Sequence, residues 1–285
     1  MAAESVGMSQ KKKDRAATIG MIIFFSILAI LTVLPIYLLV LASFKPGNFL
    51  LQYGLNLNLD IPHLTLDNYK LLFTGKHDYW TWFGNSLILT VITVILTLAI
   101  SAFVAYGFAA YDFKGKNFFF IIVLLILSVP FEVIMLPLYK QISSWGMMDS
   151  YVSVVLPFLA HASTIFFFRQ YLLGLPKSLI EAGRIDGATE YGIFFKLIVP
   201  IMKPAFSAMA ILNGMNAWNN YLWPTIILQD KNEVTMPMLV ANLKSGYSVD
   251  YGMLMLGVLI CTLPTAIIFL CLQKSFANGL AGAVK

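Results

Sequence analysis

Charged residues are scarce in this chain of 285 residues, since Asp, Glu, Lys and Arg together account for 12% of it. A soluble domain carries about 25% charged residues, which cover the surface that faces water. Apolar types make up 59% of the sequence, and the mean hydropathy is +0.80. The composition argues against a soluble enzyme, a disordered protein and a nucleic-acid-binding protein. It favours an integral membrane protein with several spans.

Cysteine and histidine are too few and too scattered to build a metal site. Cys261 and Cys271 stand ten residues apart in one apolar run, which is about 15 Å on a helix and too far for a disulfide. The three histidines are His63, His77 and His161. An integral membrane enzyme would need a cluster of His, Asp or Glu at one membrane face, so this class is not favoured. The sequence predicts no metal, no cofactor and no catalytic residue on this chain.

The sequence also lacks a nucleotide-binding loop of the P-loop type, which needs Gly, four residues and then Gly-Lys-Ser/Thr. The pairs Gly75-Lys76 and Gly115-Lys116 are followed by His and Asn, and neither has a Gly five positions earlier. The sequence therefore predicts no nucleotide site on this chain, so any ATP hydrolysis must be supplied by another chain.

Six apolar stretches have about the length that crosses a bilayer as a helix. They span roughly 19–43, 83–110, 118–139, 151–171, 201–228 and 251–272. No strand-type alternation persists along the chain, so the prediction is an all-α membrane protein with six transmembrane helices. The first stretch is too long for a signal peptide and has no small-residue cleavage site after it, so it is interpreted as a retained anchor.

The basic residues predict the orientation, because Lys and Arg accumulate in cytoplasmic segments. With the N-terminus in the cytoplasm, thirteen of the nineteen Lys and Arg residues fall on the inner side, so both termini are predicted to be cytoplasmic. The predicted organisation is a cytoplasmic segment, 1–18, and a single transmembrane domain, 19–285. Two outer loops, about 44–82 and 229–250, and one inner loop, about 172–200, are long.

The inner loop carries the most specific pattern. Ser178 followed by Glu181 reads as a capping box, so a short helix is predicted to start there. Gly187 is placed to end that helix, since glycine readily adopts the left-handed conformation. A second helical stretch, about 189–197, should follow. Small and apolar residues on an exposed helix suggest a docking surface.

This loop resembles the EAA loop of ABC importer permeases, which reads Glu-Ala-Ala, three residues, Gly, nine residues and then Ile-x-Leu-Pro. Here Glu181-Ala182-Gly183, Gly187 and Leu197-Ile198-Val199-Pro200 keep the spacing. Gly183, Leu197 and Val199 depart from the pattern. The run Trp218-Asn-Asn-Tyr-Leu-Trp-Pro224 and the C-terminal Gly279-Leu-Ala-Gly-Ala-Val-Lys285 resemble the carbohydrate branch of the family, and in particular the smaller, six-helix partner of the maltose-type pair.

The resemblance implies the fold of a type I ABC importer permease in the plasma (inner) membrane of a prokaryote. It implies a second permease subunit, two ATPase subunits that bind ATP and Mg, and an extracellular sugar-binding protein as partners. The residues implied to couple to the ATPase are Glu181, Ala182, Gly183, Asp186 and Gly187. The implied cargo is a sugar, and more specifically an oligosaccharide; a polyol or glycerol phosphate is the alternative within the family. The alternative for Glu181 alone is that it only closes its own capping box.

Polar residues inside the apolar stretches are candidates for the substrate path. Asn213, Asn216 and Asn220 fall at spacings of three and four, on one helix face. Glu132 lies within the third stretch, where an acid is costly unless it faces a cavity or a polar partner. Trp218 and Trp223 offer aromatic surfaces. The alternatives are helix–helix hydrogen bonds for the amides, interfacial anchoring for the tryptophans and a structural role for Glu132.

Two further interpretations remain open from the residues alone. Met236, Pro237 and Met238 lie in the outer loop that, by the resemblance, enters the sugar site of the binding protein; the alternative is a plain solvated turn. A secondary transporter or channel that works without ATP is the rival class. It would need ionisable groups or a repeat-built site at the membrane midplane, and it leaves the EAA-type loop unexplained.

Overall fold

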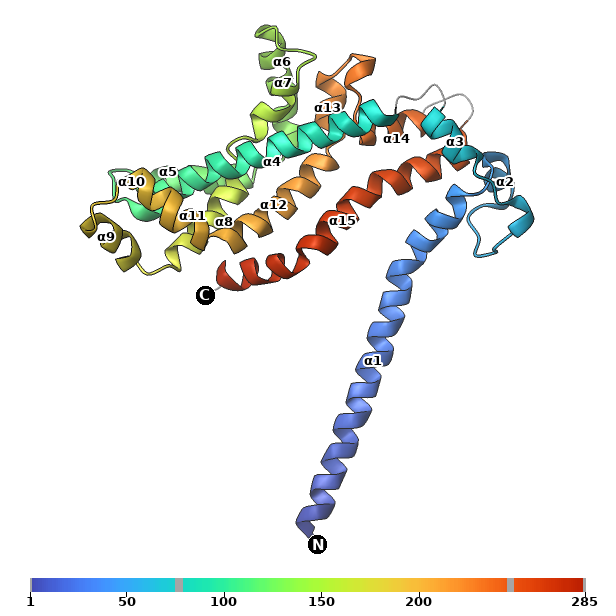
Figure 1. Ribbon diagram of the computed structural model, residues 1–285, viewed down its shortest axis with the longest axis horizontal. Coiled ribbons are helices and arrows are strands. Elements are labelled where there is room, and N and C mark those ends of the chain that lie inside the picture. The colour runs from blue at the N-terminus through green and yellow to red at the C-terminus, as the bar shows by residue number, and fades with distance from the viewer. Residues whose placement is uncertain (1, 75–78, 245–248, 284–285) are drawn as a thin grey trace. The chain divides into compact units, whose positions relative to one another are not determined.

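The computed structural model describes residues 2–74, 79–244 and 249–283, and throughout these ranges the regular structure is helical (Figure 1). Parts of both predicted outer loops, residues 75–78 and 245–248, lie outside the described residues, as do Met1 and the C-terminal residues 284–285. The chain divides into two compact units, residues 1–77 with 243–260, and residues 78–242 with 261–285.

Three helices of the described chain are long and apolar enough to cross a membrane. They are Ala17–Ser43 of α1 (Ala2–Ser43), α4 (Tyr79–Ala110) and Tyr251–Cys271 of α15 (Tyr251–Ala283). Three bent helix pairs also have the composition of a span, which gives up to six spans when each pair is counted as one. Each of the six predicted stretches overlaps one of these helices or pairs, but three of them are not single straight helices. The fifth stretch, 201–228, overlaps a pair over 190–201 and 203–218 that is bent by 75° and begins before the predicted span.

The first unit contains α1, α2 (Gly47–Tyr53), the 3₁₀ turn η1 (Ile61–His63), α3 (Asp67–Thr74) and the start of α15. A lysine organises the loop after α1. Lys45 is only 1% exposed, and its Nζ donates to the Asn56 side chain at 2.8 Å and to the Asn58 carbonyl at 2.9 Å. A buried ammonium needs such partners, because its desolvation is otherwise costly.

The second unit is built on α4, which packs against α8 (Ala162–Leu173) and α12 (Lys203–Trp218). Its core includes Phe168, Ile193 and Met202, all fully buried. The remaining elements are α5 (Lys116–Leu127), α6 (Phe131–Ser144), α7 (Tyr151–Val155), η2 (Leu156–Phe158), α9 (Ser178–Ile185), α10 (Glu190–Gly192), η3 (Ile193–Ile198), α11 (Val199–Ile201), α13 (Leu222–Ile227), η4 (Lys231–Glu233) and α14 (Met236–Lys244), the last two residues of which are assigned to the first unit.

The third predicted span is broken in the middle. Helices α5 and α6 meet at a bend of 101° over residues 128–130. Pro130 is the N-cap of α6 with φ −61° and ψ 136°, an extended conformation that ends the preceding helix. Glu132 therefore lies in the first turn of α6, not in the middle of a continuous helix as predicted.

The fourth and fifth predicted spans are interrupted as well. The fourth bends by 45° between η2 and α8, next to His161. In the fifth, α12 ends at Trp218, and α13 begins only at Leu222. The expected single helix over 201–228 is wrong at this point, and Asn220 lies in the break rather than on the helix face of Asn213 and Asn216.

Candidate functional site

The predicted inner loop forms a helix, a tight turn and a second helix, as its sequence indicates. Helix α9 begins at Ser178, but its N-cap is Lys177 and no side chain caps it, so the predicted capping box is wrong. In the described structure the Glu181 side chain is exposed and has no hydrogen-bond partner. This carboxylate is thus not used within its own helix.

Gly187 ends α9 in the left-handed conformation, with φ +76°. The Gly187 amide donates to the Arg184 carbonyl at 3.1 Å and the Ala188 amide to the Gly183 carbonyl at 3.0 Å. This pair of hydrogen bonds is the Schellman motif, which satisfies the last carbonyls of a helix and requires a residue that tolerates positive φ. The predicted role of Gly187 as the helix stop is confirmed.

The second helix runs over 190–201, through α10, the π-helical turn η3 and α11, and is thus longer than the predicted 189–197. Its N-cap is Thr189, whose hydroxyl accepts from the Gly192 amide at 3.1 Å. Helix α9 packs closely on it, because a Cβ added at Gly183 would meet the Ile193 and Leu197 side chains at 3.0 Å. Gly183, which departs from the EAA pattern, lets the two helices approach.

The outer surface of this two-helix loop exposes apolar side chains. Ile185 is 85% exposed and Tyr191 74% exposed. Ala182, Asp186 and Gly187 are also exposed, whereas Gly183 is buried. The loop thus presents both large apolar and small side chains on its surface.

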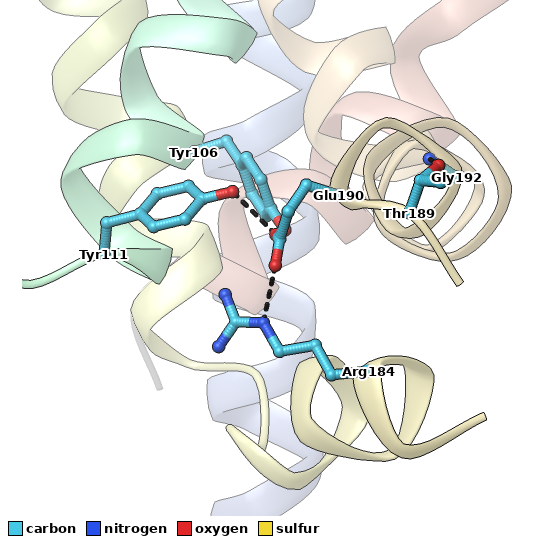
Figure 2. A network of polar contacts seen from close by, with 6 residues as sticks. All are labelled: Tyr106, Tyr111, Arg184, Thr189, Glu190 and Gly192. Carbon is cyan, nitrogen blue, oxygen red and sulfur yellow. Dashed lines mark hydrogen bonds and ion pairs between the residues drawn. The ribbon is translucent and has the colours of Figure 1, made fainter. Parts of the chain in front are cut away.

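A network of polar contacts joins the loop to the end of α4 (Figure 2). One Glu190 carboxylate oxygen accepts from Arg184 Nε at 2.6 Å, and the other accepts from the hydroxyls of Tyr111 at 2.6 Å and Tyr106 at 3.4 Å. The hydrogen bond to Glu190 raises the pKa of the Arg184 guanidinium. Desolvation, followed by its own hydrogen bond to Glu190, raises the pKa of the Tyr111 hydroxyl. Sequence reasoning did not select Glu190 or Tyr111, since their separation along the chain leaves no local pattern.

The second candidate site is a cavity of about 480 Å³ within the second unit. Its wall includes five of the predicted path residues, which are Glu132, Asn213, Asn216, Trp218 and Asn220. Its remaining wall is largely apolar or aromatic, with Phe131, Phe158 and Tyr221 among the lining residues. Among the described lining residues there is no Lys or Arg. The structure thus brings together residues from α6, α12 and the break after α12.

The polar groups of the cavity differ in whether they already have partners. Asn213 donates to the Thr164 hydroxyl of α8 at 3.0 Å, which is the helix–helix interaction expected as its alternative, and to the Met209 carbonyl of its own helix at 2.9 Å. His161, the N-cap residue of α8, bonds through Nδ1 to the Ser163 hydroxyl at 2.8 Å. The side chains of Glu132, Asn216 and Asn220 make no hydrogen bond to any other described residue. These three groups remain available to a ligand.

The two predicted path tryptophans lie in different surroundings. Trp218 is 2% exposed, donates from Nε1 to the Cys261 carbonyl at 2.8 Å and is among the residues that line the cavity. Trp223 is fully buried, is not among the cavity residues and donates to the Ser153 carbonyl at 3.1 Å. Trp223 is therefore part of the packed core and does not provide the aromatic surface that was predicted for the path.

Met236, Pro237 and Met238 form the start of helix α14. The side chains of Met236 and Met238 are buried, and the Met236 amide donates to the Ser86 hydroxyl at 2.8 Å. The alternative of a plain solvated turn is wrong for these residues.

The fold defines a class of protein: an all-helical, multi-pass membrane subunit with a loop of two packed helices. In the described residues no group of His, Cys, Asp or Glu could hold a metal ion. Residues 100–281, more than half of the chain, match the family described as binding-protein-dependent transport system inner membrane component. The chain belongs to this family of ABC importer permeases. It is a bacterial inner-membrane transport subunit and not itself an ATPase.

Relatives and a solved structure agree with this assignment. The chain is 48% identical over 268 residues to the arabinooligosaccharides transport system permease protein AraQ of Bacillus subtilis (strain 168), covering 94% of this chain and 95% of that protein. It is 36% identical over 213 residues to the lactose transport system permease protein LacG of Rhizobium radiobacter, covering 75% and 78%. A bacterial ABC transporter that imports the acidic polysaccharide alginate has the same fold, with a TM-score of 0.81, 22% identity and coverage of 93% and 98%.

Proposed function

We propose that this chain is the permease subunit of an importer for arabinose-containing oligosaccharides. The observation that carries the proposal is the 48% identity to AraQ across 94% of the chain. In the proposed topology both termini are cytoplasmic, 1–18 is a cytoplasmic segment and 19–285 is one transmembrane domain. The subunit pairs with a second permease, two ATPase subunits and an extracellular sugar-binding protein, and it forms half of the translocation path. ATP and Mg bind to the ATPase subunits.

The two-helix loop is the proposed contact with the ATPase. Glu181 offers a carboxylate that no described residue of this chain uses, and Ala182 and Asp186 flank it on the exposed surface. Gly183 holds α9 against the second helix, and Gly187 sets the turn between them. When the ATPase subunits close on ATP, a loop built in this way moves as a unit and carries the membrane helices with it.

The cavity is the proposed part of the path in this subunit. Glu132, Asn216 and Asn220 supply hydrogen-bonding groups without partners among the described residues, and Trp218 and Tyr221 add aromatic side chains to the lining. A wall with a carboxylate and without Lys or Arg suits a neutral, hydroxyl-rich ligand and disfavours a phosphate, because like charges repel in a site of low dielectric. This charge pattern makes an oligosaccharide a better cargo than a glycerol phosphate. The start of α14, Met236 to Met238, is the proposed contact with the binding protein, reached when the outer side opens.

Purification from the native membrane tests the function. Tagged wild-type chain should bring with it an ATPase and a second permease. Glu181→Ala removes the free carboxylate and should lower the amount of bound ATPase while the second permease remains. Glu132→Ala, distant from the loop in sequence and on another helix, serves as the control and should keep both. A wild-type chain that purifies alone and moves solute in liposomes without ATP would instead be a channel or secondary transporter.

The path assignment predicts a separate effect of Glu132. We expect Glu132→Gln to keep most transport of a neutral arabinose oligosaccharide, since the amide still bonds to hydroxyls. Glu132→Leu should lower it by about tenfold, in line with the loss of a hydrogen bond to a charged group. Uptake of labelled oligosaccharide into proteoliposomes measures this, with binding-protein-stimulated ATPase activity as the check on assembly. Equal activity of the leucine variant and wild type would remove Glu132 from the path.

A further inference from the structure

We propose that Glu190 is a positioning residue for coupling: its carboxylate ties the two-helix loop to the end of α4, so that a displacement of the loop reaches a membrane-spanning helix. This inference rests on the proposed function of the loop. It concerns residues whose identity the EAA-type pattern does not specify, and it assigns a role to the network in Figure 2.

Three separate segments meet on this one carboxylate. Arg184 lies in the last turn of α9, and Glu190 lies in the first turn of the second helix. Tyr106 belongs to α4, and Tyr111 is the first residue after α4. Arg184 Nε and the Tyr111 hydroxyl each lie 2.6 Å from a different carboxylate oxygen. Short bonds to an ionised acceptor are strong and directional, so they fix the relative position of the elements that carry the donors.

The loop is also held by apolar contacts. The Phe194 ring of the second helix stacks on the Phe103 ring of α4, with ring centres 4.5 Å apart. Gly183 of α9 packs on Ile193 and Leu197, which belong to the second helix. Each described hydrogen bond between residues 178–201 and the end of α4 terminates on Glu190. The Arg184 guanidinium also lies over the Tyr111 ring, 5.7 Å from its centre. Glu190 is therefore the polar junction at which α9, the second helix and α4 are held together.

A purely stabilising role does not explain this arrangement. The side chains of Arg184 and Glu190 are 41% and 42% exposed, and ion pairs at such exposure contribute little to stability. The second helix is already anchored by Ile193, Phe194 and Ile198, which are buried in the core. Removing the carboxylate should thus leave the second helix packed on α4, while α9 loses the polar connection to α4 that runs through Arg184.

The test compares variants of the complete reconstituted transporter. Glu190→Gln weakens all three bonds, and Tyr111→Phe removes a single hydroxyl on the α4 side. Both should lower the sugar molecules transported per ATP hydrolysed by about fivefold, with ATPase activity and subunit yield retained. The double variant should be no worse than the more severe single one, because both act on the same junction. Asp112→Asn, which breaks the nearby exposed pair with Lys116, is the matched control and should leave the ratio unchanged.

Two results would overturn the inference. If Glu190→Gln lowers the ratio but Tyr111→Phe does not, Glu190 acts by touching the ATPase directly. If both variants lose ATPase activity and subunit yield together, the network only stabilises the fold. If the wild-type complex shows no ATP-dependent uptake, the proposed importer function itself is wrong. The failure of the proposed function and the failure of the Glu190 inference are therefore distinguishable.

Discussion

Replacing Gly187 by valine is expected to abolish most ATP-driven uptake. Gly187 has φ +76°, a conformation that a β-branched residue adopts only under strain of about 1–3 kcal/mol. A Cβ at this position meets nothing within 4 Å, so the strain lies in the backbone and not in a clash. Relief of the strain undoes the Schellman bonds and changes the angle at which α9 leaves the second helix. Uptake into proteoliposomes should fall by at least about tenfold.

Asparagine at the same position provides the matched control. It is larger than alanine but tolerates the left-handed region, so Gly187→Asn should keep most of the uptake. Gly187→Pro should resemble valine, because proline cannot adopt positive φ and lacks the amide that donates to the Arg184 carbonyl. If valine and asparagine variants transport equally well, the geometry of this turn does not matter for coupling.

The sequence predicted the straight spans and the loop better than the bends. The apolar runs at 19–43, 83–110 and 251–272 correspond to α1, α4 and α15, because hydropathy over about 20 residues is a strong signal. The break at Pro130 had a visible cause in the proline itself. The break after Trp218 had no such cause at its position, since Asn219 and Asn220 are compatible with either a helix or a loop, and tertiary packing decides between them.

Within the candidate sites, too, features that depend on local sequence were predictable, and features that depend on packing were not. Gly187 was predictable because the requirement for positive φ is local. The capping box failed because Ser178 already lies within the first turn, and the chain enters through Lys177 in a helical conformation. Glu190 and Tyr111 are 79 residues apart, so their contact depends on how α4 packs against the second helix. Asn213 and Asn216 were placed correctly on one face, but only the packing shows that Asn213 is already bonded to Thr164.

Trp223 provides the second large expected effect, on stability. Its side chain is fully buried, meets Phe131 edge to face with ring centres 5.7 Å apart and donates to the Ser153 carbonyl. It belongs to a core cluster with Leu89, Ile142, Val154 and Ile227. Truncation of a buried tryptophan costs about 3–5 kcal/mol. Trp223→Ala should therefore lower the unfolding temperature of the purified complex by roughly 10 °C.

The variants at Trp223 also decide between a core residue and a residue of the path. Trp223→Phe keeps most of the volume but loses the bond to Ser153, so it should be less destabilising and should transport the same sugars with the same affinity. Trp145→Ala removes a tryptophan that is 55% exposed and is the matched control, with little change in unfolding temperature expected. A phenylalanine variant of normal stability but altered sugar preference would place Trp223 on the path. Because the Trp223 side chain has no exposed surface, it could meet sugar only if the surrounding helices separated. We therefore expect the phenylalanine variant to keep the sugar preference of the wild type.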